Sequence, residues 1–200
     1  MIVKDAYRFL IPLIVSAVLA YALGLYLAAA LVMVLAVFVA LFFRNPTREI
    51  PQDPRVIVSP ADGRVVRIEH VGNVTKVSIF LSLFNVHVNR SPIAGRIEAI
   101  DYKKGKFKAA FDHAASVENE RNVIMVSQGD LKIVFTQIAG LVARRIVCWK
   151  KVGDTVAKGE LIGLIRFGSR VDVLFPGGTE VTVTRGARVR GGSSPIGIIK

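Results

Sequence analysis

The sequence predicts a mainly β protein, a duplicated β-sandwich or barrel of hairpins, preceded by a hydrophobic helical hairpin. Three observations support this fold class. No charged residue occurs from Phe9 to Phe43. After a polar, Pro-rich segment, short β-branched runs alternate with Gly, Pro and Asp, which is typical of strands and turns. Finally, SPADGRVVRI at 59–68 is echoed by SPIAGRIEAI at 91–100, which indicates an internal repeat.

The apolar segment, residues 1–43, is expected to associate with a membrane. A bilayer span needs about 20 apolar residues, so the run is long for one helix and slightly short for two. Gly24 lies near its middle and suits a turn. Lys4 and Arg8 precede the run, and Arg44 and Arg48 follow it. Because basic flanks prefer the cytoplasmic side, a hairpin with both ends there is favoured over one tilted span. The run is too long for a signal peptide.

The remaining chain divides into a linker, residues 44–58, and a β domain, residues 59–200. The whole chain has a net charge of +12, and residues 1–43 contribute only +1 of it. Next to a membrane segment, this excess favours anionic lipid headgroups as partner. No basic run with interleaved aromatics suggests nucleic-acid binding. Formation of a homo-oligomer is left open.

The β domain shows a series of short apolar runs, followed by turn residues. KVGDTVAKGELIGLI reads as a hairpin of the kind found in biotinyl and lipoyl domains, and Lys158 lies in its turn. A non-enzymatic carrier or membrane scaffold is therefore one alternative function, although a similar fold does not by itself imply the same function. The segment FDHAASVENERN fits either a loop or a short helical turn. The predicted strands are VIVS, RVVRI, KVSIFLS, NVIMVS, LKIVFTQIA, RRIVCW, ELIGLIRF, RVDVLF and EVTVTR.

Cysteine and histidine usage argues against disulfide and metal chemistry. The single cysteine, Cys148, cannot form an internal disulfide and sits in an apolar stretch, which suggests a packed thiol. The histidines, His70, His87 and His113, have no Cys or His partners at ligand spacing, so no metal site is expected.

Three residues could together supply acid–base and nucleophilic chemistry. They are Asp62 in SPADG, His87 in FNVHVNRSP and Ser193 in GGSS. An acid, a base and a nucleophile need only converge in space, whatever their order in the chain. Each also has an ordinary structural explanation: a turn aspartate, a strand histidine and a flexible tail serine.

With their flanking sequences, these residues resemble the phosphatidylserine decarboxylase family, in its short form. The resemblance covers nearly all of the soluble part. It rests on FFRNP, SPADG, KVSIFLSLFNVHVNRSP, KGKF, ENERN, QIAGLVARRIVC, GLIRFGSRVD and the terminal Gly–Ser.

The resemblance implies a self-processing, pyruvoyl-dependent lyase. Members are made as proenzymes that cut themselves at a Gly–Ser bond, here Gly192–Ser193, which would give a large chain 1–192 and a small chain 193–200. His87, oriented by Asp62, would take the Ser193 proton. Ser193 would become a pyruvoyl group, the cofactor, which forms a Schiff base with the substrate amine and accepts electrons as CO₂ leaves. His87 would then donate a proton.

The sequence departs from the family pattern at two positions. Some members carry a second histidine three residues before His87, where this chain has Phe84. Ser194 follows the Gly–Ser pair where threonine is common, and it is also a rival nucleophile. The residue bonded directly to Gly192 is better placed to attack its carbonyl.

The substrate is expected to be a phospholipid in the cell membrane, with the catalytic domain on the cytoplasmic side. Phosphatidylserine would give phosphatidylethanolamine, and archaetidylserine would give archaetidylethanolamine by the same reaction. Arginines suit the phosphodiester more than the departing carboxylate, because binding the carboxylate tightly would stabilise the ground state. Each candidate could equally be an ordinary surface charge. The candidates are Arg90, Arg144, Arg145 and Arg170.

Overall fold

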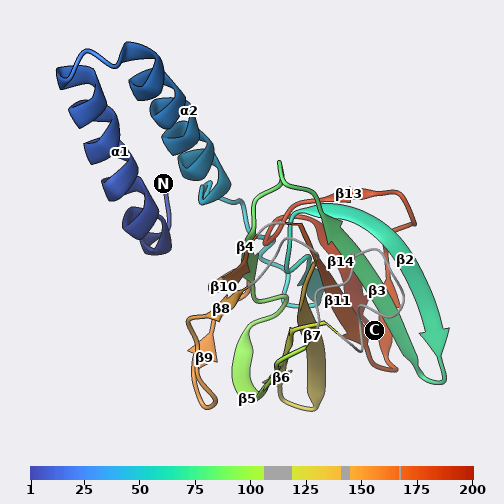
Figure 1. The fold of residues 1–200 in the computed structure, drawn as a ribbon. Helices are drawn as coiled ribbons and strands as arrows, with labels where there is room; N and C mark the ends of the chain where they lie inside the picture. Colours follow the sequence, from blue (N-terminus) through green and yellow to red (C-terminus); the bar gives the residue numbers. More distant parts are fainter. Residues whose placement is uncertain (106–118, 141–144, 167) are drawn as a thin grey trace. The chain divides into compact units, whose positions relative to one another are not determined.

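The computed structural model of this 200-residue chain describes residues 1–105, 119–140, 145–166 and 168–200. Its contacts divide it into two compact units, Met1–Thr47 and Arg48–Lys200. The first unit is helical and the second is built of β-strands (Figure 1). The expected combination of a helical hairpin and a mainly β domain is confirmed.

The helical unit is a pair of antiparallel helices, α1 (Tyr7–Ala22) and α2 (Tyr26–Phe42), after a short 3₁₀ turn, η1 (Lys4–Ala6). Gly24 lies between the helices with φ of 75°, so the turn falls where the sequence predicts it. Small side chains are buried within this unit, including Ala17, Ala29 and Ala36, whereas most large apolar side chains are exposed. Among the described residues, one helical segment, Lys4–Ala22, is long and apolar enough to cross a membrane, and α2 is apolar but shorter.

A bridge between Ile2 and Arg44 joins the two ends of the helical hairpin. Asn45 also donates its N–H to the carbonyl of Met1 at 2.7 Å. Lys4, Arg8 and Arg44, which flank the apolar run, therefore lie at the same end of this unit, whereas Arg48 belongs to the β unit.

The β unit contains three antiparallel sheets (Figure 1). The large sheet has the strand order β13-β2-β3-β11-β7-β6-β5-β9, and the two small sheets have the orders β1-β14-β12 and β4-β10-β8. The strands are β1 (Val56–Val58), β2 (Gly63–Val71), β3 (Val74–Leu81), β4 (Val88–Arg90), β5 (Gly95–Lys103), β6 (Arg121–Gln128), β7 (Leu131–Ala139), β8 (Ile146–Cys148), β9 (Thr155–Val156), β10 (Leu161–Ile165), β11 (Ser169–Phe175), β12 (Thr179–Val181), β13 (Arg188–Val189) and β14 (Pro195–Ile199).

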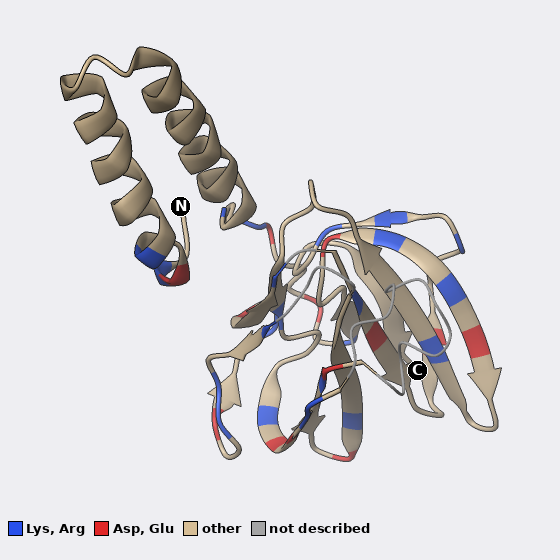
Figure 2. Ribbon diagram, in the orientation of Figure 1, with Lys and Arg blue, Asp and Glu red and all other residues tan. Residues whose placement is uncertain are grey.

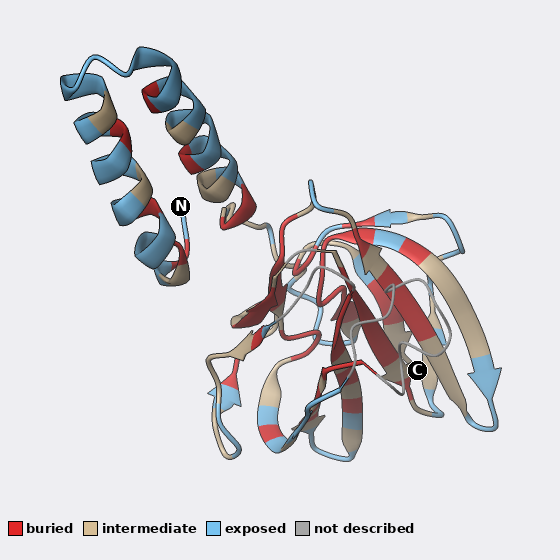
Figure 3. Ribbon diagram, viewed as in Figure 1, coloured by how far each residue is buried: buried red, intermediate tan, exposed pale blue. Residues whose placement is uncertain are grey.

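The core lies on the inner faces of these sheets (Figure 3). Strands β6 and β7 show the alternation that a half-buried sheet requires, because successive side chains point to opposite faces. In β6, Asn122, Ile124 and Val126 are buried, and the residues between them are partly exposed. Large buried side chains such as Phe135 and Phe175 fill the space between the sheets.

The internal repeat seen in the sequence is also present in the strand pairing. Repeat A consists of β1, β2, β3, β13 and β14, and repeat B consists of β4, β5, β6, β9 and β10. In repeat A, β2 pairs with β3 and β13, and β1 pairs with β14. In repeat B, β5 pairs with β6 and β9, and β4 pairs with β10. The chain thus builds the same arrangement twice.

The repeated glycines, Gly63 and Gly95, explain why the SPxxG motif occurs in both repeats. Each begins the long strand of its repeat, β2 or β5, with φ of 156°. A Cβ atom at Gly63 would lie 2.2 Å from the carbonyl oxygen of Phe80, and one at Gly95 would lie 2.0 Å from that of Ser127. Only glycine permits the neighbouring strand to approach so closely.

Candidate active site

Asp62 lies directly before β2 and is largely buried. Nη2 of Arg48 lies 2.8 Å from each of its carboxylate oxygens. The N–H of Gly191 donates to Oδ1, also at 2.8 Å. Bonds between ionised groups of this kind are among the strongest hydrogen bonds in proteins. Arg48 therefore orients Asp62, and Asp62 in turn fixes the backbone just before Gly192.

Sequence reasoning missed Arg48, because it treated residues 44–58 as a linker. In the structure, Arg48 belongs to the β unit and its side chain is only 9% exposed. A buried carboxylate needs a partner, so the sequence could have indicated that Asp62 pairs with a cation. Nothing in the local pattern distinguishes Arg48 from other arginines of the chain.

Residues 190–194 form a tight turn between β13 and β14, which we call turn A. The carbonyl of Arg190 accepts the N–H groups of Ser193 and Ser194 at 3.1 and 3.0 Å. Gly192 donates its N–H to the carbonyl of Ser59 at 2.8 Å, and the N–H of Ser59 donates to the carbonyl of Ser194 at 2.8 Å. Turn A is thus held from within and by the SPADG segment.

The two serines of turn A differ in their hydrogen bonding. The Ser194 hydroxyl oxygen accepts the N–H of Arg190 at 2.9 Å, so it stabilises the turn. Within the described part of the chain, the Ser193 hydroxyl forms no hydrogen bond, and the residue is partly exposed. Of the two hydroxyls, that of Ser194 holds the turn and that of Ser193 does not.

Gly192 adopts a conformation that suits a reacting peptide bond. Its φ is 80°, in the region that residues with a side chain avoid. A Cβ atom there would lie 2.8 Å from Cδ of Arg90 and 3.1 Å from Cδ1 of Ile50. Glycine thus has no Cβ beside the carbonyl carbon that precedes Ser193, and the side chains of Arg90 and Ile50 occupy that space.

His87 lies just before β4 and is 1% exposed. Its carbonyl accepts the N–H of Ile165, which anchors it to β10. The hydrogen bonds of Asp62 run to Arg48 and Gly191. The orientation of His87 by Asp62 therefore stays a prediction.

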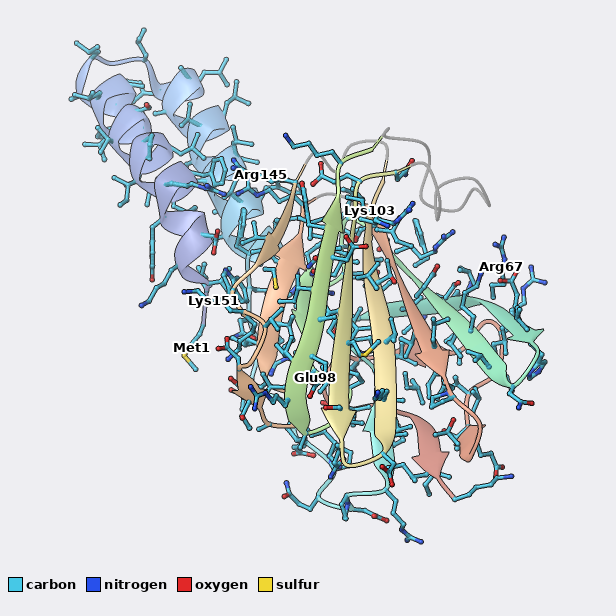
Figure 4. The ribbon with its side chains drawn as sticks, turned by 90° about the horizontal axis from the view of Figure 1, so that it is seen from below. Met1, Arg67, Glu98, Lys103, Arg145 and Lys151 are labelled. Atoms are coloured by element: carbon cyan, nitrogen blue, oxygen red, sulfur yellow. The ribbon has the colours of Figure 1, made fainter. Side chains whose placement is uncertain are left out.

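The candidate arginines occupy different surroundings. Arg90 is partly buried beside turn A and donates from Nη1 to the carbonyl of Gly159 at 2.8 Å. Burial, followed by the charge of Arg48, lowers the pKa of Arg90. Arg145 is exposed directly before β8 (Figure 4).

Of the other two candidates, one is buried and one lies outside the described residues. Arg170 is 1% exposed and forms an ion pair with Asp172, whose Oδ1 lies 2.9 Å from its Nε. Arg144 lies outside the described residues. The role of all four arginines in substrate binding stays a prediction.

Cys148 and the histidines do not build a metal site in the part of the chain that the structure describes. No group of three His, Cys, Asp or Glu side chains is close enough there to hold an ion. Cys148 is partly buried against the core, and burial raises the pKa of its thiol. His113 lies outside the described residues.

Comparison with known proteins identifies the family. Residues 35–197 match the family described as phosphatidylserine decarboxylase. This chain belongs to the phosphatidylserine decarboxylase family. The phosphatidylserine decarboxylase proenzyme of Solibacter usitatus is 50% identical over 195 residues, which cover 92% of this chain and 95% of that protein. The proenzyme of Carboxydothermus hydrogenoformans is 44% identical over 205 residues, covering 98% and 96%.

As a member of the phosphatidylserine decarboxylase family, the chain is a carboxy-lyase. Its two departures from the family pattern have clear positions. Phe84 lies on the connection between β3 and β4 and is 81% exposed. Ser194 retains a hydroxyl where threonine is common, and that hydroxyl bonds the backbone of Arg190.

Proposed function

We propose that this chain decarboxylates phosphatidylserine to phosphatidylethanolamine, with a pyruvoyl group that it makes from its own Ser193. The observation that carries the proposal is turn A, where a glycine with positive φ precedes an accessible serine and Asp62 binds the neighbouring backbone. Archaetidylserine is the alternative substrate, because its reacting headgroup is the same.

Processing would begin when Oγ of Ser193 attacks the carbonyl carbon of Gly192. His87 takes the hydroxyl proton, and the peptide C–N bond breaks as the amide nitrogen is protonated, which leaves an ester. Loss of the α-proton of residue 193 then breaks the ester bond and releases the carboxylate of Gly192. The resulting dehydroalanine takes up water and loses ammonia, so a ketone remains at the start of chain 193–200.

The strand that follows residue 193 is held in the sheet on both sides. The small chain would consist mainly of β14, which lies between β1 and β12 in its sheet. Ile196 is fully buried, and the backbone of Ile198 is paired with Val56 on one side and Glu180 on the other. These contacts would retain the small chain after the peptide bond is cut.

In the decarboxylation, the pyruvoyl group would supply a ketone to which the serine amine can bind and an electron sink as CO₂ leaves. The residues around it would hold the headgroup and control protons. His87 is our candidate to return a proton to the former α-carbon. Arg90, packed against Gly192, would contribute positive charge beside the reacting headgroup.

The helical unit would attach the enzyme to the cell membrane. The large apolar side chains of α1 and α2 are mostly exposed within this unit, as a lipid-facing hairpin requires. The basic residues before and after the apolar run, Lys4, Arg8 and Arg44, lie at one end of the hairpin. This arrangement favours the cytoplasmic side for the catalytic unit. A substrate with two acyl chains stays in the bilayer, so an attached enzyme meets it there.

The mass of the purified protein tests this proposal. We expect two chains, 1–192 and 193–200, and a small chain whose ketone reacts with hydroxylamine. Ser193→Ala should remain one chain and should cause the serine lipid to accumulate in cells. Ser194→Ala is the matched control: it should still be cut after Gly192, although more slowly than the wild type, because its hydroxyl helps to hold turn A. A wild-type chain that stays continuous would instead support a scaffold or carrier function.

A further inference from the structure

A cavity of about 540 Å³ opens beside turn A. It lies where β2, β3 and β13 meet the turn, and it includes the carboxylate residue Asp62. Its lining residues are Asp62, Gly63, Arg64, Phe80, Ser82, Asn85, Arg188, Val189 and Arg190. The proposed mechanism gives no role to the three arginines of this set.

Arg64, Arg188 and Arg190 concentrate positive charge on one wall of this cavity. Arg64 and Arg188 are directly opposite each other in the β2–β13 ladder, and Figure 2 shows basic positions on both strands. Like charges in opposite positions destabilise a sheet. Within the described residues, no acidic side chain pairs with any of the three. An anion bound between them would relieve this repulsion.

Repeat B lacks this arrangement. Arg96 of β5 occupies the place that Arg64 has in β2, but its partner on β9 is Thr155. The facing pair of arginines therefore occurs only in the repeat that carries turn A. The internal repeat supplies a natural control position for the charge cluster.

An apolar tip adjoins the cavity. Ser82 and Asn85, which line the cavity, close a turn: the Asn85 side chain accepts the N–H and the hydroxyl of Ser82, each at 2.8 Å. Leu83 and Phe84 lie between them and are 42% and 81% exposed. Exposed apolar side chains beside a polar site suit contact with the acyl region of a lipid.

We propose that Arg64, Arg188 and Arg190 bind the phosphodiester of the lipid substrate, with Leu83 and Phe84 against its acyl region. This inference rests on the proposed function. A short chain of single bonds joins the serine amine to the phosphodiester, so the phosphate must bind close to residue 193. Arginine matches the geometry of phosphate oxygens, and three arginines line this cavity, of which Arg190 belongs to turn A.

The test compares Arg64→Gln, Arg188→Gln and the double variant with the full-length wild type. Arg96→Gln is the matched control from repeat B. The assay measures decarboxylation in mixed micelles of neutral detergent, with the mole fraction of phosphatidylserine varied. We expect each single cavity variant to raise KM by about 10- to 100-fold, as for loss of one charge-assisted hydrogen bond, and the double variant to raise it further. Arg188→Lys should lie between the wild type and Arg188→Gln, and Arg96→Gln should match the wild type.

Two readouts separate this inference from the proposed function. Cleavage after Gly192 and the rate of ketone capture by hydroxylamine require no phosphate, so both should be unchanged in the cavity variants. Uncut or hydroxylamine-inert variants would assign the arginines a structural role and overturn the inference. An uncut wild type would overturn the proposed function itself.

The source of the bound anion is tested by adding phosphatidylglycerol or inorganic phosphate to the micelles. If the cavity binds substrate, phosphatidylglycerol competes with phosphatidylserine in the wild type and less so in the double variant. If the arginines bind bystander lipid, the variants keep the wild-type KM in neutral micelles and change only their response to phosphatidylglycerol. Inhibition by inorganic phosphate alone, with KM unchanged, would likewise overturn substrate binding.

Discussion

Turn A and its counterpart in repeat B have nearly the same backbone but different chemistry. We call residues 157–160, between β9 and β10, turn B. Gly192 and Gly159 have φ of 80° and 75°. Gly192 donates to the carbonyl of Ser59, and Gly159 donates to that of Ser91, both at 2.8 Å. The next residue in each turn donates its N–H to the carbonyl three residues before it, at 3.1 Å in both turns.

The side chains show what repeat A has in addition. The residue after the glycine is Ser193 in turn A and Glu160 in turn B. In turn B, the Glu160 carboxylate accepts the N–H of Ala157 at 2.7 Å. In turn A, Ser194 accepts the corresponding N–H. The hydroxyl of Ser193 is thereby left available for reaction.

The two repeats also differ in the residue before the repeated glycine, which is acidic only in repeat A. Asp62 precedes the repeated Gly63, whereas Ala94 precedes Gly95. Asp62 binds the backbone of Gly191, and the residue in that position of turn B is Lys158. The strained glycine turn is therefore common to both repeats, and the proposed self-cleavage would depend on the few side chains added in one of them.

Replacing Asp62 by the alanine that repeat B has in its place should have the largest effect on the rate of processing. Asp62→Ala copies Ala94 and removes the acceptor of the Gly191 N–H. We expect processing to slow by about 10²- to 10⁴-fold, up to the effect of losing the orienting aspartate of a Ser-His-Asp triad. The fraction of uncut chain, followed by mass after cell-free synthesis, measures this effect.

Two controls accompany Asp62→Ala. Asp62→Asn keeps an acceptor for Gly191 and reduces the disturbance caused by leaving Arg48 buried without its anion. Asp130→Ala changes an exposed aspartate on the β6–β7 turn and should be cut like the wild type. Processing of Asp62→Ala and Asp62→Asn at the wild-type rate would show that Asp62 only supports the fold.

Removing the side chain that caps each turn should have a moderate effect and a different outcome in each repeat. Ser194→Ala and Glu160→Ala each delete the acceptor of one backbone N–H, and each should lower the free energy of unfolding by about 1 kcal/mol. Only Ser194→Ala should also slow processing, since the bond that we propose is cut lies in turn A. Urea unfolding and intact mass measure the two effects. Equal processing rates in both variants would contradict a role for Ser194 in shaping turn A.

Several of these features could be predicted from sequence because they are local. The apolar run, Gly24 and the alternating β-branched segments gave the helical hairpin and the β fold, and the SPxxG echo gave the repeat. Each of these features depends on neighbouring residues or on a pattern that recurs over a short distance in the sequence.

The pairing partners were harder to predict, because they depend on long-range contacts. The ion pair of Arg48 with Asp62 and the facing positions of Arg64 and Arg188 join segments that only the folded sheet brings together. The equivalence of turns A and B was hidden for another reason: turn A has one additional residue before the glycine of the next strand, Gly197 in repeat A against Gly163 in repeat B. This insertion masks the repeat in a direct alignment.

The smallest expected effect is a difference in acid sensitivity between the two turns. Burial opposes ionisation of Glu160, but Lys150 and the N–H of Ala157 outweigh it and lower the pKa of Glu160 below its ordinary value of 4.5. A carboxylate with a depressed pKa stabilises the folded state fully above its unfolded pKa. This contribution is lost as the pH falls through the lower, folded value. Ser194, which has the same capping role in turn A, does not titrate in this range.

Hydrogen exchange of two amides tests this difference in detergent micelles. Protection of the Ala157 amide, corrected for intrinsic exchange, should fall as the pH is lowered below 4.5, by less than about tenfold because the Glu160 side chain is partly exposed and solvent screens its charge. Protection of the Arg190 amide should stay constant, since its acceptor is a hydroxyl. Glu160→Gln should remove the pH dependence at Ala157. A parallel loss of protection at both amides would instead indicate acid unfolding of the whole β unit, and the two turns would then share one stability.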